Sequence, residues 1–148
     1  MKLKLRKAIQ ADMDLIFQWA NDAVVRANAF HTEQIPYENH VAWYTKQMKD
    51  ADSVIYLMET EKEQIGQIRF SIEDGKAIID YSVAAAFRGH GYGTKLVELG
   101  IEKLKKQRPD VSCFLAQVKY ENPSSARVFE KCGFTRKEKP EYIEYTKC

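Results

Sequence analysis

The spacing of apolar residues along the first half of the chain predicts strands and helices. Polar and apolar residues alternate from residue 2 to residue 9, which predicts a first strand. Apolar residues at helical spacing predict a helix over residues 11–23 and a second helix that begins at Ile35-Pro36. The intervening residues lack a clear period and are expected to form a loop with a short helical turn. Further strands are expected over residues 53–59, 65–72 and 77–83.

The second half of the chain alternates helix and strand. A helix is expected over residues 95–106, and Arg108-Pro109-Asp110 should end it. A strand over residues 111–118 and a helix from Asn122-Pro123 to Gly133 follow, and Phe134 and residues 142–146 should form the last strands. Because Glu73-Asp74-Gly75 also predicts a tight hairpin turn, the sheet should be mostly antiparallel. The expected fold class is α/β (α+β), as one domain over residues 1–148 with helices flanking a central sheet.

Composition narrows the classes of function. The 148 residues are 45% hydrophobic and 30% charged, as expected for an ordinary globular protein. The formal net charge of +2 is too small to indicate nucleic-acid binding. No apolar run has the length of a signal sequence or a membrane span, so we expect a cytoplasmic protein with no membrane partner. A monomer or a homodimer is expected.

The three cysteines give no sign of a structural framework. Cys113, Cys132 and Cys148 are odd in number and scattered, and no Cys-x-x-Cys pair is present. This pattern predicts three reduced thiols and neither a disulfide nor a metal site.

The candidate chemistry centres on a glycine-rich turn between a predicted strand and a predicted helix. Arg88-Gly89-His90-Gly91-Tyr92-Gly93-Thr94 follows the strand that ends at Val83. Glycines allow a tight turn and a close approach to a ligand, and the first turn of a helix presents free N–H groups. The helix dipole and the Arg88 charge favour an anion there, so the turn predicts a phosphate or pyrophosphate site.

The spacing Arg-x-x-Gly-x-Gly resembles the acetyl-CoA pyrophosphate loop of the GNAT superfamily of N-acetyltransferases. Two later motifs agree with this resemblance, Asn122-x-x-Ser125 and the ending Phe129-Glu130-Lys131-Cys132-Gly133-Phe134. The predicted order of elements also matches the GNAT fold over nearly the whole chain. The resemblance implies an enzyme that transfers acetyl from acetyl-CoA to a primary amine on a small molecule.

The resemblance also implies which residues hold acetyl-CoA, which should lie between the strand ending at Val83 and the strand over residues 111–118. The Val83 N–H should bind the thioester carbonyl, and the N–H groups of the glycine loop should bind the pyrophosphate. Asn122 and Ser125 should contact the pantetheine arm. The expected contacts are Val83, Arg88, Gly89, His90, Gly91, Tyr92, Gly93, Thr94, Asn122, Ser125 and Phe129.

One position departs from the family pattern. Many GNAT enzymes have a tyrosine seven residues after the asparagine, placed to protonate the leaving thiolate, and this chain has Phe129 there. Either another group is the acid, with Tyr120, Tyr142 and Tyr145 as substitutes, or the thiolate leaves unprotonated. We expect Phe129 to be a wall of the cofactor channel.

The base that removes the amine proton has two candidates. Asp80 lies on the strand before the glycine loop, and the imidazole of His40 titrates near neutral pH. Relay through water is the alternative to a direct base.

The segment between Trp19 and Trp43 should form the acceptor side. It contains Trp19-Ala20-Asn21-Asp22, Val25-Arg26, Asn28-x-Phe30 and His40-x-x-Trp43. These motifs resemble a GNAT subgroup that acetylates nucleotide-linked amino sugars, including pseudaminic-acid-pathway and spore-coat polysaccharide enzymes. The resemblance assigns a 4-amino sugar to a pocket of Arg26, Asn28, Phe30, His40 and Trp43, with Arg26 meeting a phosphate. Two alternatives stay open: another amine (a protein N-terminus, lysine, polyamine or antibiotic), or a non-catalytic acyl-CoA-binding module.

Overall fold

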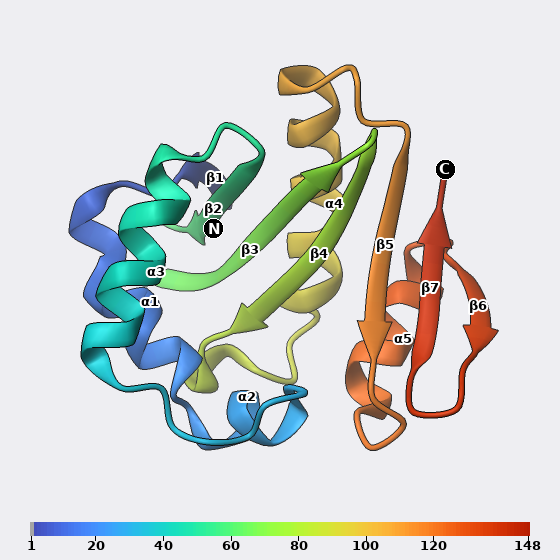
Figure 1. The fold of residues 1–148 in the computed structure, drawn as a ribbon, viewed down its shortest axis with the longest axis horizontal. Helices are drawn as coiled ribbons and strands as arrows, with labels where there is room; N and C mark the ends of the chain where they lie inside the picture. Colours follow the sequence, from blue (N-terminus) through green and yellow to red (C-terminus); the bar gives the residue numbers. More distant parts are fainter. Residues whose placement is uncertain (1) are drawn as a thin grey trace.

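A computed structural model describes residues 2–148 and contains one seven-stranded sheet (Figure 1). The strand order is β1-β2-β3-β4-β5-β7-β6. The strands are β1 (Lys4–Lys7), β2 (Ser53–Glu59), β3 (Gln64–Glu73), β4 (Lys76–Val83), β5 (Cys113–Val118), β6 (Thr135–Glu138) and β7 (Ile143–Lys147). All neighbouring strands are antiparallel except β4 and β5, which are parallel. The expected mixed α/β fold with a mostly antiparallel sheet is confirmed.

Helices cover both faces of this sheet. The helices are α1 (Met13–Ala20), α2 (Ala23–Asn28), α3 (Tyr37–Lys49), α4 (Tyr92–Gln107) and α5 (Pro123–Lys131), with short 3-10 turns at Gln10–Asp12 and Ala85–Phe87. Side chains alternate along β2, so that Ile55 and Leu57 join the small core under α1 and α3. Val54, Tyr56 and Met58 join the large core under α4. The helical turn expected before residue 34 is the separate helix α2, which begins where the Asp22 carboxylate accepts the N–H groups of Val24 and Val25.

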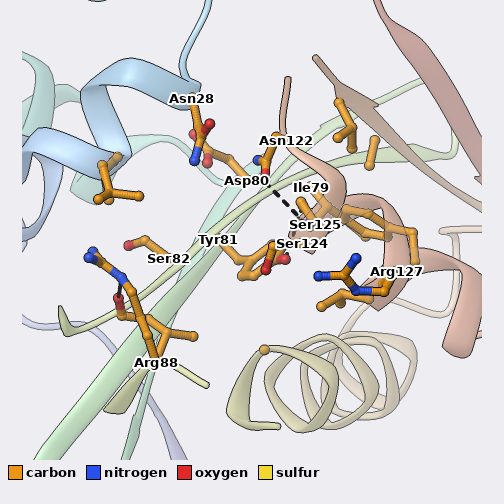
Figure 2. A pocket seen from close by; sticks show the side chains of 18 of the residues that line it. Asn28, Ile79, Asp80, Tyr81, Ser82, Arg88, Asn122, Ser124, Ser125 and Arg127 are labelled. Atoms are coloured by element: carbon orange, nitrogen blue, oxygen red, sulfur yellow. Dashed lines mark hydrogen bonds between the residues drawn. The ribbon is translucent and has the colours of Figure 1, made fainter. Parts of the chain in front are cut away.

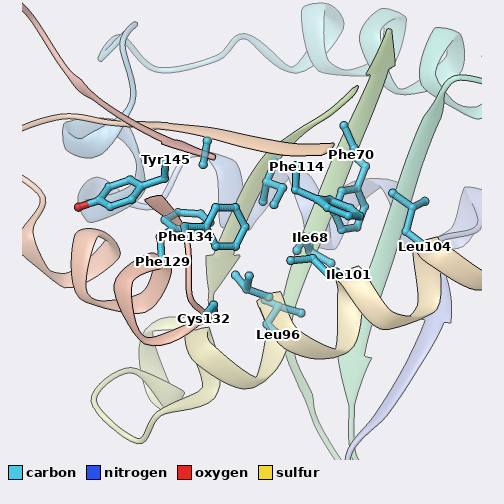
Figure 3. Close-up of a cluster of buried hydrophobic side chains, with 14 of the residues drawn as sticks. Ile68, Phe70, Leu96, Ile101, Leu104, Phe114, Phe129, Cys132, Phe134 and Tyr145 are labelled. Atoms are coloured by element: carbon cyan, nitrogen blue, oxygen red, sulfur yellow. The ribbon is translucent and has the colours of Figure 1, made fainter. Parts of the chain in front are cut away.

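The large core fixes α4 and α5 against β3, β4 and β5 (Figure 3). Phe70, Phe114 and Phe129 are each at most 2% exposed, and burial of each ring stabilises the fold by roughly 2–3 kcal/mol. Gly100 lets α4 approach the sheet, because a Cβ there would lie 3.0 Å from Ile68 Cδ1. The elements on both sides of the β4–β5 boundary are therefore held firmly by one continuous core.

The sheet is open along the lower part of that boundary. The β4–β5 ladder pairs Lys76 with Cys113 and ends where Ile78 pairs with Leu115. Beyond that point β4 continues to Val83 and β5 to Val118, and the two strands diverge (Figure 1). This divergence creates the gap in which the candidate site lies.

The prediction of three reduced thiols is wrong, because Cys113 and Cys148 form a disulfide. The antiparallel register of β5 and β7 pairs Phe114 with Lys147, which brings the preceding and following cysteines opposite each other. Their separation of 35 residues hid this pairing in the sequence. Cys132 is a free thiol in the large core. Within residues 2–148, no helix is long and apolar enough to cross a membrane.

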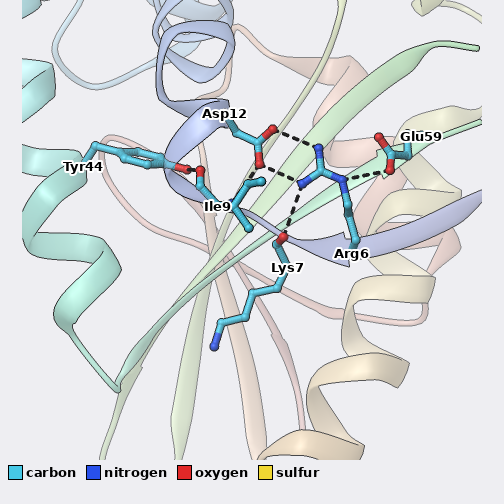
Figure 4. A network of polar contacts seen from close by, with 6 residues as sticks. All are labelled: Arg6, Lys7, Ile9, Asp12, Tyr44 and Glu59. Atoms are coloured by element: carbon cyan, nitrogen blue, oxygen red, sulfur yellow. Dashed lines mark hydrogen bonds and ion pairs between the residues drawn. The ribbon is translucent and has the colours of Figure 1, made fainter.

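A polar network joins β1 to the turn before α1 (Figure 4). Both oxygens of the Asp12 carboxylate accept hydrogen bonds from Arg6, at 2.8 and 2.9 Å, and one also accepts the Ile9 N–H. Arg6 also donates to Glu59 on β2 at 2.8 Å. Hydrogen bonding from Arg6 lowers the pKa of Asp12 despite the burial of its carboxyl group.

We expect Asp12→Asn to destabilise the fold by about 2 kcal/mol, because it leaves the half-buried Arg6 charge without its main partner. A carboxyl group whose folded pKa is depressed stabilises the fold above its unfolded pKa, and this contribution is lost as pH falls through the folded value. The difference between native and variant stability should therefore shrink as pH falls below about 4. Denaturant titrations at neutral and acidic pH measure this difference in the free energy of unfolding, with Glu61→Gln as an exposed control. A difference that does not change with pH would show that the Arg6–Asp12 pair is not its source.

Candidate functional site

A cavity of about 560 Å³ occupies the gap between β4 and β5. Its wall is made by the diverging strands, the glycine loop, the first turn of α4 and one side of α5, with α2 at one side (Figure 2). The gap exists because parallel pairing stops at Ile78, which leaves the last residues of β4 facing open space.

The backbone of β4 directs two N–H groups into this gap. The Ala84 N–H donates to the Ile65 carbonyl on β3 at 2.8 Å. Because successive N–H groups in a strand point to opposite sides, those of Val83 and Tyr81 point away from β3. They face the β5 side, beyond the last β4–β5 pair. These N–H groups are therefore available to the carbonyl oxygens of an extended ligand in the gap.

The glycine loop lies at the wide end of the gap. Gly89 and Gly91 have φ of +80° and +82°, a left-handed conformation that favours glycine. No atom lies within 4 Å of the position a Cβ would take at either residue. Gly91 is the N-cap of α4, so the free N–H groups of that helix begin at Tyr92. The loop and the helix start therefore form the cradle that a pyrophosphate requires.

The charge of Arg88 suggests a direct contact with phosphate, but its side chain makes contacts within the protein. Its guanidinium binds the Asp22 carboxylate, with an N–O distance of 2.7 Å, and its Nε donates to the Val83 carbonyl at 3.1 Å. The expectation of a free phosphate-binding charge at this position is corrected: Arg88 ties α2 to the glycine loop. Arg127 and Lys131 on α5 also line the cavity and bring positive charge from its other wall.

The first turn of α5 contributes polar groups to the same wall. The Asn122 side chain accepts the Ser125 N–H at 3.2 Å and caps the helix. The Ser125 hydroxyl lies 3.0 Å from the Tyr81 hydroxyl (Figure 2). Phe129 is buried, and its ring lies 5.8 Å from that of Tyr81 and 5.7 Å from that of Tyr145. Its burial agrees with the expected role as a wall.

The other face of β4 carries an ion pair. Asp80 accepts a hydrogen bond from Arg69 on β3 at 2.9 Å, and both residues line the cavity. The Arg69 guanidinium lies 5.0 Å from the centre of the Trp43 ring, which is a cation–π contact. Asp80 is exposed, so its carboxylate is accessible to an incoming amine.

The acetyltransferase (GNAT) domain model matches residues 2–135 of this chain. The chain belongs to the GNAT acetyltransferases. It is therefore an N-acetyltransferase of the class that takes its acetyl group from acetyl-CoA. Among curated proteins, none matches the sequence.

Solved structures share the fold of this GNAT acetyltransferase. The spermidine N-acetyltransferase of Vibrio cholerae, in complex with CoA and spermine, has a TM-score of 0.85 at 17% identity, over 97% of this chain and 93% of the other. A ribosomal alpha-N-protein acetyltransferase with coenzyme A has a TM-score of 0.83 at 18% identity, over 99% and 94%. An aminoglycoside acetyltransferase with coenzyme A and kanamycin has a TM-score of 0.83 at 21% identity, over 99% and 94%.

His40 lies outside the cavity of this GNAT acetyltransferase. It is 2% exposed, and its Nε2 lies 2.9 Å from the Met13 carbonyl oxygen. Its ring packs against Phe17, Trp43 and Tyr44 in the small core. Burial lowers the pKa of His40, which favours the neutral ring. The hypotheses of His40 as base and as substrate contact are therefore not supported, since a helix stripe alone does not reveal which face is buried.

Two further residues that were expected to contact the acceptor make structural contacts instead. Arg26 lines the cavity, but its Nε donates to the Ala20 carbonyl at 2.7 Å and its Nη1 to the His31 carbonyl at 2.9 Å. These bonds hold the loop after α2, so the guanidinium is not a free phosphate clamp. Trp43 does not line the cavity and reaches it only through Arg69.

The remaining candidates divide between the cavity and its rim. Val83, Gly89, Gly91, Tyr92, Gly93 and Thr94 all line the cavity. His90 is exposed outside it, with its Nδ1 2.9 Å from the Arg88 carbonyl oxygen. Asn28 and Phe30 line the side formed by α2, and the Phe30 ring contacts that of Tyr142 at 5.9 Å.

None of the three tyrosines suggested as acids lines the cavity. Tyr142 contacts Phe30 at the rim, Tyr120 donates to the Lys139 carbonyl at 2.6 Å, and Tyr145 donates to Glu130 at 2.6 Å. The cavity instead contains Tyr81, which the sequence reasoning missed. The sequence contains a signal for this residue: Tyr81 lies two positions before Val83 on the same strand, so the two side chains point to the same face of the sheet.

Arg69 was also missed, although the hairpin turn predicts its position. A tight turn at Asp74-Gly75 places residue 69 opposite residue 80, and the register is observed. Counting back from that turn is therefore enough to pair Arg69 with Asp80 from the sequence alone.

Proposed function

We propose that this acetyltransferase passes acetyl directly from acetyl-CoA to the primary amine of a nucleotide-linked amino sugar. The charge of the cavity wall is the observation that carries the choice of acceptor. Five cationic side chains line the cavity, and Asp80 is the one acidic side chain among the described residues that do so. Arg88 is paired with Asp22 and Arg69 with Asp80, which leaves three of the five without a carboxylate partner among the described residues: Arg26, Arg127 and Lys131. The cations are Arg26, Arg69, Arg88, Arg127 and Lys131.

In this proposal the cofactor lies along β4. The pyrophosphate rests on the N–H groups of the glycine loop and of the start of α4, and the pantetheine arm runs past Val83. The thioester lies near the Tyr81 and Val83 N–H groups, which stabilise negative charge on its oxygen. Arg127 and Lys131 suit the phosphate groups at the adenosine end because they lie on α5 beside the loop.

The acceptor approaches from the face of β4 that carries Asp80. The Asp80 carboxylate receives the proton that the amine loses, directly or through a water molecule. Arg69 replaces Arg26 as the group that meets a phosphate of the acceptor, because its guanidinium is on the open face and is oriented by Trp43. Asn28 and Phe30 supply an amide and an aromatic ring for the sugar.

A polyamine or a cationic antibiotic is the main competing acceptor. The spermidine and aminoglycoside enzymes that share the fold bind spermine and kanamycin. A polycation favours a site with several carboxylates, whereas here Asp80 is already paired with Arg69. The cavity charge therefore supports a neutral or anionic acceptor over a polycation.

Location and assembly remain predictions within this proposal. A cytoplasmic protein, as a monomer or a homodimer without a nucleic-acid partner, is the expectation from the sequence. Because Cys113 and Cys148 form a disulfide, the expected reduced thiols no longer support a cytoplasmic location.

An acceptor panel tests the proposal. CoA release should be fastest with UDP-linked amino sugars and slow with spermidine, kanamycin and an N-terminal peptide. Arg69→Ala should raise KM for the sugar nucleotide roughly tenfold, because it removes one partly exposed charge-assisted contact with the acceptor phosphate; kcat should change as well, since Arg69 also binds the Asp80 carboxylate.

The matched control is Arg136→Ala, which removes an arginine that pairs with Glu130 and Glu138 away from the cavity. It should leave KM unchanged. Rapid acetylation of spermidine, kanamycin or peptide, with none of the sugar nucleotides, would refute the acceptor assignment and leave acetyl transfer in place.

A further inference from the structure

Tyr81 places a phenol in the cofactor gap. Tyr81 and Tyr92 are the tyrosines that line the cavity among residues 2–148. Tyr92 belongs to the glycine loop, where its ring packs against Phe87 and His90. The Tyr81 ring instead points toward α4 and α5, and its hydroxyl lies 3.0 Å from the Ser125 hydroxyl.

The surroundings of this ring fix the place of its hydroxyl. A Cβ on Gly93 would lie 3.4 Å from Tyr81 Cε2 and 3.8 Å from its hydroxyl oxygen, so the ring reaches the first turn of α4. On its other side it contacts Phe129 on α5 with a centroid distance of 5.8 Å. The hydroxyl therefore lies between two helix starts and beside the Phe129 ring, which has no proton to give.

We propose that Tyr81 donates its hydroxyl proton to the sulfur of CoA as the acetyl group is transferred. The amine nitrogen forms a bond to the carbonyl carbon, and the carbon–sulfur bond breaks with its electron pair going to sulfur. The Tyr81 proton moves to that sulfur and gives the free thiol. The amine's own proton goes to Asp80 and from there to solvent, and the phenolate regains one proton from solvent through the Ser125 hydroxyl, so that both side chains return to their starting states.

The protonation state of Tyr81 agrees with this role. The pKa of Tyr81 is raised to about 12, mainly by burial and to a smaller extent by Cys132 and Asp80, and the hydrogen bond with Ser125 partly offsets this rise. Of the cations that line the cavity, Arg127 and Lys131 on α5 and Arg88 in the loop lie on the elements around the ring. The phenol is therefore protonated at neutral pH and holds a proton for the departing sulfur, and its raised pKa also makes it a weaker acid than an exposed tyrosine.

Tyr81→Phe tests the proposal because it removes one oxygen and keeps the ring. We expect kcat to fall roughly a hundredfold, with the KM for acetyl-CoA changed less than about threefold. The control is Tyr56→Phe: Tyr56 is also buried with a pKa of about 12, but its hydroxyl donates to Gln107 outside the cavity. A Tyr81→Phe variant with native kcat, or one that loses only CoA affinity, would overturn the proposal.

A second measurement needs no acceptor and does not rely on turnover. Fluorotyrosine incorporated at residue 81 keeps the shape of the ring and lowers the pKa of its hydroxyl. Its fluorine resonance should shift on addition of CoA and shift much less with desulfo-CoA, which lacks the thiol. Equal shifts with both ligands would overturn the proposal, even for a protein whose acceptor is not a sugar nucleotide. The proposal rests on acetyl transfer alone, so failure of the acceptor assignment is a separate result.

Discussion

Gly91→Val is expected to weaken CoA binding roughly tenfold to a hundredfold while the chain stays folded. Gly91 has a φ of +82°, which a β-branched residue rarely adopts, and it directly precedes the first residue of α4. A valine would turn the loop so that one or two of its N–H groups no longer point at the pyrophosphate. Each charge-assisted hydrogen bond lost costs about 1.5–3 kcal/mol of binding free energy.

Gly133→Val is the matched control for this prediction. Gly133 also has a φ of +82°, at the end of α5, and does not line the cavity. Both variants should lose stability, but only Gly91→Val should lose CoA affinity in calorimetric titration. Unchanged affinity in a folded Gly91→Val protein would mean that the loop does not bind the pyrophosphate.

Gly66→Ala is expected to destabilise the fold by about 3 kcal/mol, although it adds a single methyl group. A Cβ at Gly66 would lie 2.5 Å from the Ser82 carbonyl oxygen and 3.2 Å from the Val83 Cα. These are backbone atoms, so β3 and β4 would have to separate at the pair formed by Gly66 and Val83. Because that separation moves the Val83 N–H, CoA affinity should fall as well.

Denaturant unfolding of Gly66→Ala beside Ser71→Ala measures this effect. Ser71 is exposed on the same strand, so its replacement should change the free energy of unfolding by less than about 0.5 kcal/mol. A Gly66→Ala protein as stable as the native one would show that the strands tolerate a side chain at this position. The close approach of β3 to β4 at Gly66 would then not be needed to position Val83.

Local patterns in the sequence were sufficient for most of the fold. Alternation along β3 and β4 and the Asp74-Gly75 turn predicted the hairpin, because a two-residue turn and a buried face together fix the register. Asn122-Pro123 predicted the start of α5, where the Asn122 side chain does cap the helix. These signals succeed because each depends on neighbouring residues alone.

The glycine loop is the part of the candidate site whose conformation was predictable from the sequence. Glycine spacing identified the loop with positive φ at Gly89 and Gly91, since few other residues adopt that conformation. Side chains were less predictable, because arginine and histidine serve structure and chemistry equally well. Arg26 binds loop carbonyls, Arg88 binds Asp22, and His40 is buried, and all three depend on contacts between distant segments.

Contacts between segments that are distant in the sequence explain why the disulfide and the position of Tyr81 were not predicted. Cys113 and Cys148 meet only through the register of β5 and β7. Tyr81 and Ser125 meet only because α5 packs beside β4 across the gap. A search for a tyrosine at the family's position on α5 therefore could not find one on β4.

The most direct test of the account is an NMR titration of the isotopically labelled protein with CoA. If CoA lies in the β4–β5 gap, the largest amide shifts should belong to Tyr81, Val83, Gly89, Gly91 and Gly93, with smaller shifts near Ser125. Amides of the small core under α1 and α3, such as those of Tyr44 and Leu57, should not move. Saturable shifts elsewhere, with Val83 and Gly91 unchanged, would contradict the placement of acetyl-CoA in this gap.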